Sequence, residues 1–192
     1  MHRRQPLPRL WLMTDERLGG DLWGALAALP KGSGIVFRHY SLPPGERRRL
    51  FDRVRAVARR RRLILLLAGE PRLANAWKAQ GSHGSRPRRG EGSAIRSMPV
   101  HDLAELVAAR RARADLLFVS PVFATRSHPG ARTLGPAGLA RLIRAAHAPV
   151  VALGGVDPAS AKTLRRCGIY GWAAIDAWSA VASAQKRKAV PI

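Results

Sequence analysis

The sequence predicts an α/β fold, a (β/α)8 TIM barrel formed by one compact domain. Short apolar runs alternate with stretches of helical spacing, and this order is typical of a parallel sheet. Eight such strand candidates follow one another, which favours a closed barrel near the lower size limit of about 200 residues. The alternative, an open doubly wound sheet, needs a glycine-rich turn after its first strand, and residues 14–17 (TDER) contain no glycine.

Four strands and three helices are expected in the first half of the chain. The strands are expected at residues 10–14, 34–37, 63–67 and 81–83, and the helices at residues 21–29, 43–60 and 71–80. Residues 63–67 (LILLL) form a continuous apolar run, as expected for a strand buried on both faces. The second helix begins at two prolines and carries Leu50, Val54 and Val57 on one face.

The second half of the chain supplies four more units. Its strands are expected at residues 94–98, 116–119, 150–153 and 171–175, and its helices at residues 101–111, 136–146, 157–166 and 177–188. Asp157 and Pro158 combine an N-cap residue with a first-turn proline. Residues 85–92 (SRPRRGEG) lack periodicity and are expected to form a loop.

The domain boundaries follow from these elements. We expect a basic N-terminal tail at residues 1–9, the barrel at residues 10–184 and a basic C-terminal tail at residues 185–192. No apolar run reaches the roughly 18 residues of a membrane span, so no membrane partner is expected. The single cysteine, Cys167, fits a reducing compartment, and a cytoplasmic location is expected. The oligomeric state stays open, and a homo-oligomer is compatible with the sequence.

The formal net charge is +22, which can indicate nucleic acid, an anionic surface or an anionic substrate as partner. The arginine clusters are dispersed and lie mostly near expected helix ends and tails, where cations are favourable. No aromatic residues are interleaved with the basic runs, which argues against a dedicated nucleic-acid site. A small phosphorylated or anionic substrate is therefore the expected partner.

Two expected strands end in loops suited to a ligand. The strand at residues 116–119 leads into a loop with hydroxyl groups and cations: Thr125, Arg126, Ser127 and His128. The strand at residues 150–153 leads into Gly154 and Gly155. Barrel sites lie at the carboxyl ends of the strands, so both loops are expected to face one pocket. The glycine pair allows either close approach of an anion or tight packing of a turn, and both readings stay open.

Five stretches together resemble the thiamine phosphate synthase / TenI family. Residues 10–15 resemble its LYLITD strand, residues 101–115 its H-x-x-x-E…A-D helix, and residues 168–177 its last strand. Residues 120–135 resemble the G-P-V-F-x-T-x-[TS]-K…G loop, and residues 149–156 (PVVALGGV) match P-V-V-A-I-G-G-I. The resemblance covers nearly the whole chain and is sharpest in its C-terminal half.

The resemblance implies a transferase of thiamine biosynthesis, which couples an aminopyrimidine-methyl pyrophosphate to a thiazole phosphate with help from Mg²⁺. Arg38 would contact the pyrophosphate, and Gly155, beside Gly154, the thiazole phosphate. Thr125, Ser127 and His128 would contact the thiazole carboxylate or the pyrophosphate. His101 and Asp176 complete the expected substrate pocket.

Several positions depart from the family pattern. The two Mg²⁺ carboxylates correspond to Gly69 and Arg88, which cannot act as oxygen side-chain ligands, so the metal is either lost or held elsewhere. A phosphate-contacting serine corresponds to Asp176. A carboxylate about 4 Å from a phosphate is unfavourable by roughly 4 kcal/mol per unit charge at an effective dielectric constant near 20. Phosphate binding then requires that Asp176 is protonated or paired with an arginine. The candidates are Arg126, Arg132 and Arg165.

These departures leave two hypotheses. The first is an active synthase in which arginines replace the metal as the pyrophosphate clamp, since guanidinium groups bind phosphate in bidentate fashion. The second is a non-catalytic or repurposed barrel that binds another small anionic ligand. In the TenI branch, the histidine of the thiazole tautomerase activity corresponds to Pro121.

The remaining candidates are histidines and one serine. His39, His83 and His101 lie at the ends of expected strands and could face one pocket, yet no short ligand spacing supports a zinc site. Ordinary pocket or capping roles are favoured for all three. Ser97 has no base motif near it in the sequence and is expected to be structural.

Overall fold

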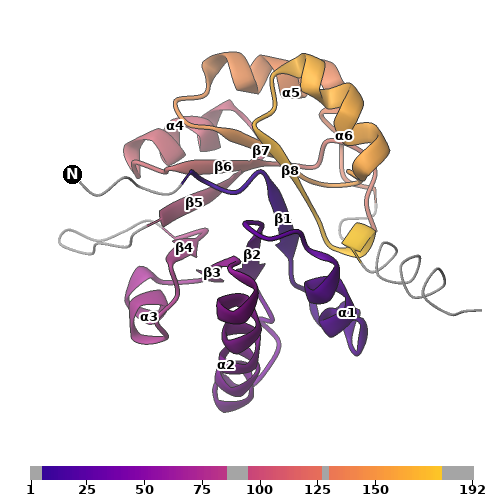
Figure 1. The fold of residues 1–192 in the computed structure, drawn as a ribbon. Coiled ribbons are helices and arrows are strands. Elements are labelled where there is room, and N and C mark those ends of the chain that lie inside the picture. Colours follow the sequence, from indigo (N-terminus) through magenta and orange to yellow (C-terminus); the bar gives the residue numbers. More distant parts are fainter. Residues whose placement is uncertain (1–5, 86–94, 127–129, 179–192) are drawn as a thin grey trace, which may run out of the picture.

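The protein forms a closed barrel of eight parallel strands with helices outside it (Figure 1). The structure, a computed structural model, describes residues 6–85, 95–126 and 130–178. The strands are β1 (Leu10–Met13), β2 (Gly34–Phe37), β3 (Ile64–Ala68), β4 (Gly81–His83), β5 (Ile95–Val100), β6 (Leu116–Val119), β7 (Val150–Ala152) and β8 (Gly171–Ala174). Each strand pairs with the next in the chain, and β8 pairs with β1. The predicted barrel is therefore confirmed.

The helices alternate with the strands as expected. They are α1 (Asp21–Ala28), α2 (Pro44–Arg61), α3 (Pro71–Ala76), α4 (Leu103–Arg111), α5 (Gly135–Ala145) and α6 (Pro158–Leu164), with short 3-10 helices η1 (Glu16–Leu18) and η2 (Arg165–Cys167). Most of the closing helix expected at residues 177–188, the C-terminal tail and the start of the N-terminal tail lie outside the described residues.

Three helix boundaries differ from the expected ones by two residues or more, each for a local reason. Helix α3 ends at Ala76, short of residue 80, because Lys78 has a left-handed backbone with φ of +58°. Helix α4 begins at Leu103 because the side chain of Asp102 accepts a hydrogen bond from the Glu105 amide and caps the helix. Beyond Leu164 the chain tightens into η2, so α6 stops short of residue 166.

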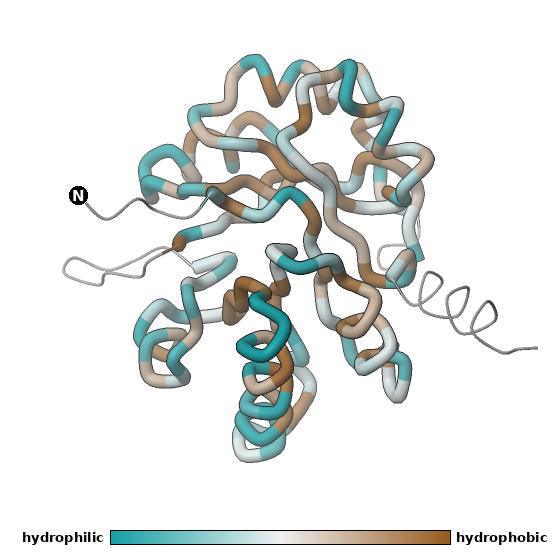
Figure 2. Tube along the Cα trace, viewed as in Figure 1, coloured by the Kyte–Doolittle hydropathy of each residue, from teal (hydrophilic) through white to brown (hydrophobic). Residues whose placement is uncertain are grey.

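Apolar side chains fill the barrel and the layer between strands and helices. Figure 2 shows the hydrophobic residues along the strands and hydrophilic residues on the outer side of α2. Inside the barrel, the fully buried Trp11 packs edge-to-face on Phe118, with 5.3 Å between the ring centroids. Gly34 leaves room for Trp11, because a Cβ at residue 34 would collide with the indole ring. Among the described residues, no helix is long and apolar enough to cross a membrane.

Candidate functional site

A cavity of about 400 Å³ opens at the carboxyl ends of β6, β7 and β8. Four segments form most of its wall: residues 120–121, 124–126, 153–156 and 174–177. Arg38, His101 and Ala131 complete the lining. The two loops singled out in the sequence therefore meet at one cavity, in the place where barrel enzymes hold their ligands.

Gly154 and Gly155 pack directly against the loop that follows β6. Their φ angles are +88° and +64°, and a Cβ on Gly154 would lie 2.8 Å from the Cα of Pro121. A Cβ on Gly155 would collide with the carbonyl oxygen of Ala124. The amide of Phe123 donates to the Gly154 carbonyl at 3.0 Å and ties the two loops together. The glycine pair is thus required for packing, whatever else it does at the cavity.

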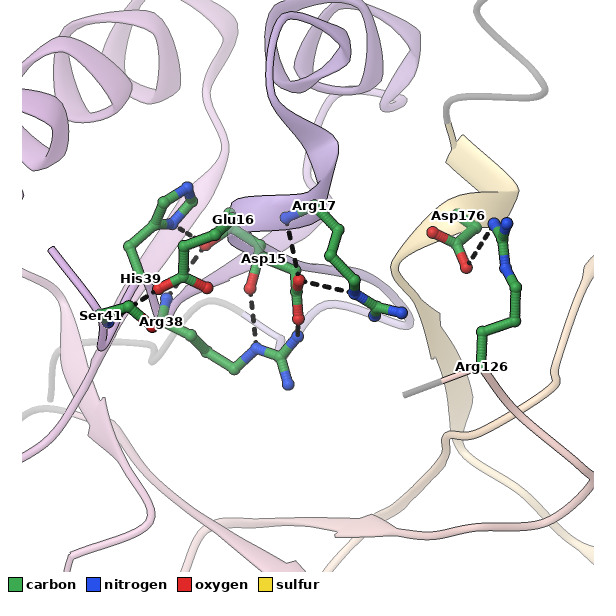
Figure 3. Close-up of polar contacts among 9 residues, drawn as sticks. Asp15, Glu16, Arg17, Arg38, His39, Ser41, Arg126 and Asp176 are labelled. Atoms are coloured by element: carbon green, nitrogen blue, oxygen red, sulfur yellow. Dashed lines mark hydrogen bonds and ion pairs between the residues drawn. The ribbon is translucent and has the colours of Figure 1, made fainter. Parts of the chain in front are cut away.

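Arg38 reaches the cavity from the end of β2 and is held by the end of β1. Its Nε donates to the Thr14 carbonyl at 2.7 Å, and its Nη2 donates to Asp15 Oδ2 at 2.7 Å (Figure 3). Its own carbonyl accepts a hydrogen bond from Arg47 Nε at 2.9 Å. Burial lowers the pKa of Arg38, and the charge of Asp15 opposes this shift. The guanidinium group is therefore oriented before any ligand binds.

Asp15 is the residue that sequence reasoning missed. Its Oδ1 accepts from the backbone amide of Arg17 at 3.1 Å and from Arg17 Nε at 2.8 Å. Burial favours the neutral acid, but hydrogen bonds from Arg17 and the charge of Arg38 outweigh burial and lower the pKa of Asp15. The sequence signals for Asp15 are its place directly after a strand, at the barrel end that carries the cavity, and its match to the last residue of the LYLITD motif.

Asp176 forms an ion pair with Arg126 across the cavity mouth. Arg126 Nη2 lies 3.0 Å from Asp176 Oδ2, and Figure 3 shows the two side chains facing each other from the loop after β6 and the end of β8. The side chains are 79% and 42% exposed, so water screens the pair. Of the three arginines considered for this role, the structure places Arg126 beside Asp176.

The three histidines do not form one cluster in the structure. His39 Nδ1 lies 2.9 Å from Thr14 Oγ1, and its ring stacks on Phe37. His101 lines the cavity, and its Nδ1 lies 2.7 Å from Glu105 Oε2. His83 is buried, and desolvation together with the charge of Arg38 lowers its pKa to about 3.

Ser97, for which the sequence offered no nearby base, is hydrogen-bonded to His83. The distance from His83 Nδ1 to Ser97 Oγ is 3.0 Å, and both side chains are buried. The two residues are register partners on the neighbouring strands β4 and β5. Neither lines the cavity, so the pair satisfies buried polar atoms and serves the barrel interior.

Thr125 lies in the cavity wall, as the sequence predicted. Ser127 and His128 lie outside the described residues, so their predicted contacts with a substrate remain predictions. Arg88, which corresponds to a family metal ligand, also lies outside the described residues.

The described residues do not fit a magnesium ion held by protein carboxylates. Gly69 follows β3 with no side chain, and no atom lies within 4 Å of the point where its Cβ would be. Three of the carboxylates at this end of the barrel already have partners: Arg17 and Arg38 for Asp15, the Ser41 amide for Glu16, and Arg126 for Asp176. In the described part of the chain, no group of three or more His, Cys, Asp or Glu residues could hold a metal.

Comparison with known proteins gives one consistent family. The family model described as thiamine monophosphate synthase matches residues 12–178. A putative thiamine-phosphate synthase 2 of Aquifex aeolicus (strain VF5) is 31% identical over 179 residues, which cover 88% of this chain and 96% of that protein. A thiamine-phosphate synthase of Chloroflexus aurantiacus is 29% identical over 181 residues, 88% of this chain and 84% of that protein.

Solved structures agree with the sequence comparison. A thiamine phosphate pyrophosphorylase from Pyrococcus furiosus superposes with a TM-score of 0.75 at 25% identity, covering 94% of each chain. An N-acetylmannosamine-6-phosphate 2-epimerase from Clostridium perfringens superposes with a TM-score of 0.64 at 14% identity, over 98% of this chain and 96% of that one. The similarity to the epimerase shows only that the two proteins share a fold.

Proposed function

The chain belongs to the thiamine monophosphate synthase family, and from this premise we propose that it is a transferase of thiamine biosynthesis. In the proposed reaction, the nitrogen of a thiazole attacks the methylene carbon of an aminopyrimidine-methyl pyrophosphate. A C–N bond forms, the C–O bond to pyrophosphate breaks, and the electron pair of that bond leaves with pyrophosphate. The family resemblance implies that the thiazole substrate is a phosphate ester.

The observation that carries this proposal is the position of the cavity. Its wall consists of the loops after β6 and β7, the two stretches in which the family motifs are sharpest. These loops are locked together by the packing of Gly154 and Gly155 against residues 121–124. The family resemblance and the available space thus coincide in one place.

Arg38 is the proposed contact for the leaving pyrophosphate. Arg38 lies in the cavity wall, and Thr14 and Asp15 orient its guanidinium group. A cation that is already oriented in this way stabilises the negative charge that develops on a leaving group. Thr125, Ser127 and His128 are proposed to hold the substrates in line for attack, and His101 is proposed as pocket lining. Because the described residues do not fit a carboxylate-bound metal, no step is assigned to Mg²⁺.

The experiment is a coupling assay with the purified chain and both substrates, with and without Mg²⁺. Thiamine phosphate, measured as its fluorescent oxidised derivative, is the expected product. Arg38→Lys should lower its formation strongly, whereas Arg48→Lys is the matched control, since Arg48 lies on α2 and pairs with Asp52 away from the cavity. Absence of product from the unaltered chain under all conditions would refute the proposal.

A second candidate is a repurposed barrel that binds another small anionic ligand. Asp176 favours it, because a carboxylate in the cavity wall opposes a phosphate group. A thermal-shift screen separates the two. Stabilisation by thiazole phosphate or thiamine phosphate supports the synthase, and indifference to both supports the repurposed barrel.

A further inference from the structure

Positive charge gathers at the end of the barrel where the strands begin. Helix α2 ends at Arg61 and β3 begins at Ile64, and the ends of α3, α4, α5 and η2 likewise lie close before the next strand. Because these helices surround one barrel (Figure 1), their C-termini meet at the same end of it. The cations there form a surface that we call the amino face: Lys78, Arg144 and the arginines of residues 59–62, 110–113 and 165–166.

The cations of the amino face are available to an outside partner. All of them are exposed except Arg61, which donates to the Leu29 carbonyl at 2.8 Å. Within the described part of the chain, no ion pair engages any of them. One described carboxylate lies at this end, Asp115, which accepts a hydrogen bond from the Arg96 amide at 2.8 Å.

The separation of charge follows from the fold. Most carboxylates of the described residues lie directly after strands or in the first turns of helices, at the end that carries the cavity. Acidic groups near a helix N-terminus and basic groups near its C-terminus each complement the helix dipole. Since all the helices run in the same direction around the barrel, these local preferences add up to one acidic end and one basic end.

This arrangement changes one expectation from the sequence. The basic clusters are dispersed along the chain, and their dispersion counted against a dedicated nucleic-acid site. The barrel brings the same clusters to one face, so that objection no longer applies. The basic runs contain no interleaved aromatic residues, so stacking of single-stranded bases is still disfavoured.

We propose that the amino face binds the phosphate backbone of duplex nucleic acid without reading its sequence. A duplex presents one negative charge per about 1.7 Å of its axis, and guanidinium groups bind phosphate oxygens in bidentate fashion. The other extended anionic partner is a lipid bilayer, whose interfacial binding combines cations with apolar side chains that enter the membrane. The exposed large apolar side chains of the described residues are Tyr40, Leu103 and Val107, and none belongs to the amino face. The observations therefore favour the duplex.

The first test measures binding of the purified full chain to short RNA and DNA duplexes by fluorescence anisotropy at several salt concentrations. Each phosphate that is neutralised contributes about −0.9 to the slope of log affinity against log salt, so contact with about four phosphates predicts a slope near −3.6. A change of base sequence should alter the affinity less than twofold. A slope shallower than about −1 would overturn the inference, because it leaves about one phosphate contact.

The second test removes charge from the amino face. The double variant Arg59→Gln, Arg60→Gln should lower the affinity for both duplexes at least fivefold and make the salt slope shallower by about 1–2. The matched control is Arg49→Gln, Arg132→Gln, which removes the same charge from two exposed side chains: Arg49 lies near the start of α2, and Arg132 lies between β6 and α5. The control should change the affinity less than twofold, because the Debye length of about 10 Å screens distant charges.

A second double variant, Arg165→Gln, Arg166→Gln, removes charge from another helix end of the same face. If neither double variant weakens duplex binding more than the control does, the inference is overturned. Tighter binding to vesicles of phosphatidylserine and phosphatidylcholine than to either duplex would also overturn it and would assign the amino face to a bilayer. The cavity opens at the opposite end of the barrel, so failure of the coupling assay would leave these outcomes unaffected.

Discussion

Replacing Asp15 by alanine removes the acceptor that orients the cavity arginine. Asp15 Oδ2 accepts from Arg38 Nη2 at 2.7 Å, and the two side chains are each only 19% exposed. Asp15 Oδ1 accepts from two groups of Arg17, whose side chain is 41% exposed. The variant leaves the Arg38 guanidinium largely buried with one fewer partner.

The expected loss of stability follows from these contacts. A hydrogen bond to a charged group contributes about 1.5–3 kcal/mol, which applies to the poorly exposed Asp15–Arg38 contact. The Arg17 contact is screened by water and adds less than about 1 kcal/mol. The total is therefore about 2–4 kcal/mol. For a domain of this size, the melting temperature should fall by about 4–16 °C.

The stability lost in Asp15→Ala should depend on pH. The folded-state pKa of Asp15 is lower than its ordinary value of 3.8, so the carboxylate stabilises the fold above that value. The stabilisation is lost as the pH falls through the lowered pKa. The difference in unfolding free energy between the unaltered chain and Asp15→Ala should be constant from pH 5 to pH 8 and shrink below about 3.8.

The assay is urea unfolding followed by circular dichroism at several pH values, with Asp52→Ala as the control. Asp52 accepts from Arg48 at the same 2.7 Å and pairs with Arg55 at 3.3 Å, but its side chain is 38% exposed, so the loss of both pairs should cost only about 0.4–1 kcal/mol. The reasoning would be refuted if Asp15→Ala lowered the free energy of unfolding no more than Asp52→Ala does. It would also be refuted if the difference in unfolding free energy between the unaltered chain and Asp15→Ala did not shrink in acid.

The other predictions concern a histidine, a glycine and the cavity arginine. Burial lowers the pKa of His83 to about 3, so between pH 7 and pH 5 the unfolded chain binds a proton that the folded chain does not. Urea unfolding should therefore show that the free energy of unfolding falls by about 2 kcal/mol between pH 7 and pH 5. His83→Gln should reduce that slope, and an unchanged slope would contradict the prediction. In the same assay, Gly155→Ala should lower the free energy of unfolding by more than about 2 kcal/mol, because the added Cβ would collide with backbone atoms. Gly32→Ala is the control: Gly32 also has a positive φ, +78°, but no atom lies near its Cβ position, so the loss should be about 1 kcal/mol. Equal losses for the two variants would contradict the packing role of Gly155. Arg38→Lys should lower kcat/KM for the pyrophosphate substrate about 100-fold in steady-state kinetics, since lysine lacks the guanidinium fork, and a loss below threefold would remove Arg38 from the pyrophosphate site.

The barrel could be predicted because most of its strands are short apolar runs bounded by clear breaks; β4 (GSH) and β5 (IRSMPV) are the exceptions. Strand β6 runs from Leu116 to Val119, as expected, between Asp115 and the Ser120-Pro121 pair. Strand β2 likewise has the expected bounds, Gly34–Phe37. The early end of α3 could not be predicted, because Lys78 adopts a left-handed backbone conformation that is uncommon for lysine and has no signal in the sequence.

The site was less predictable because its contacts depend on strand register and loop conformation. Asp15 and Arg38 are 23 residues apart and meet only because β1 pairs with β2 at Met13 and Val36. The His83–Ser97 contact arises in the same way from the register of β4 and β5. The position of Gly154 and Gly155 at the cavity, in contrast, followed directly from their place after a strand.

The most direct test of the proposed coupling is to measure pyrophosphate release and the new C–N product in one reaction mixture. The purified chain receives the aminopyrimidine-methyl pyrophosphate with either the thiazole alcohol or its phosphate ester. Equal amounts of pyrophosphate and coupled product are predicted. Pyrophosphate release without coupled product, or no release with either thiazole, would contradict a coupling reaction in the cavity at the ends of β6, β7 and β8.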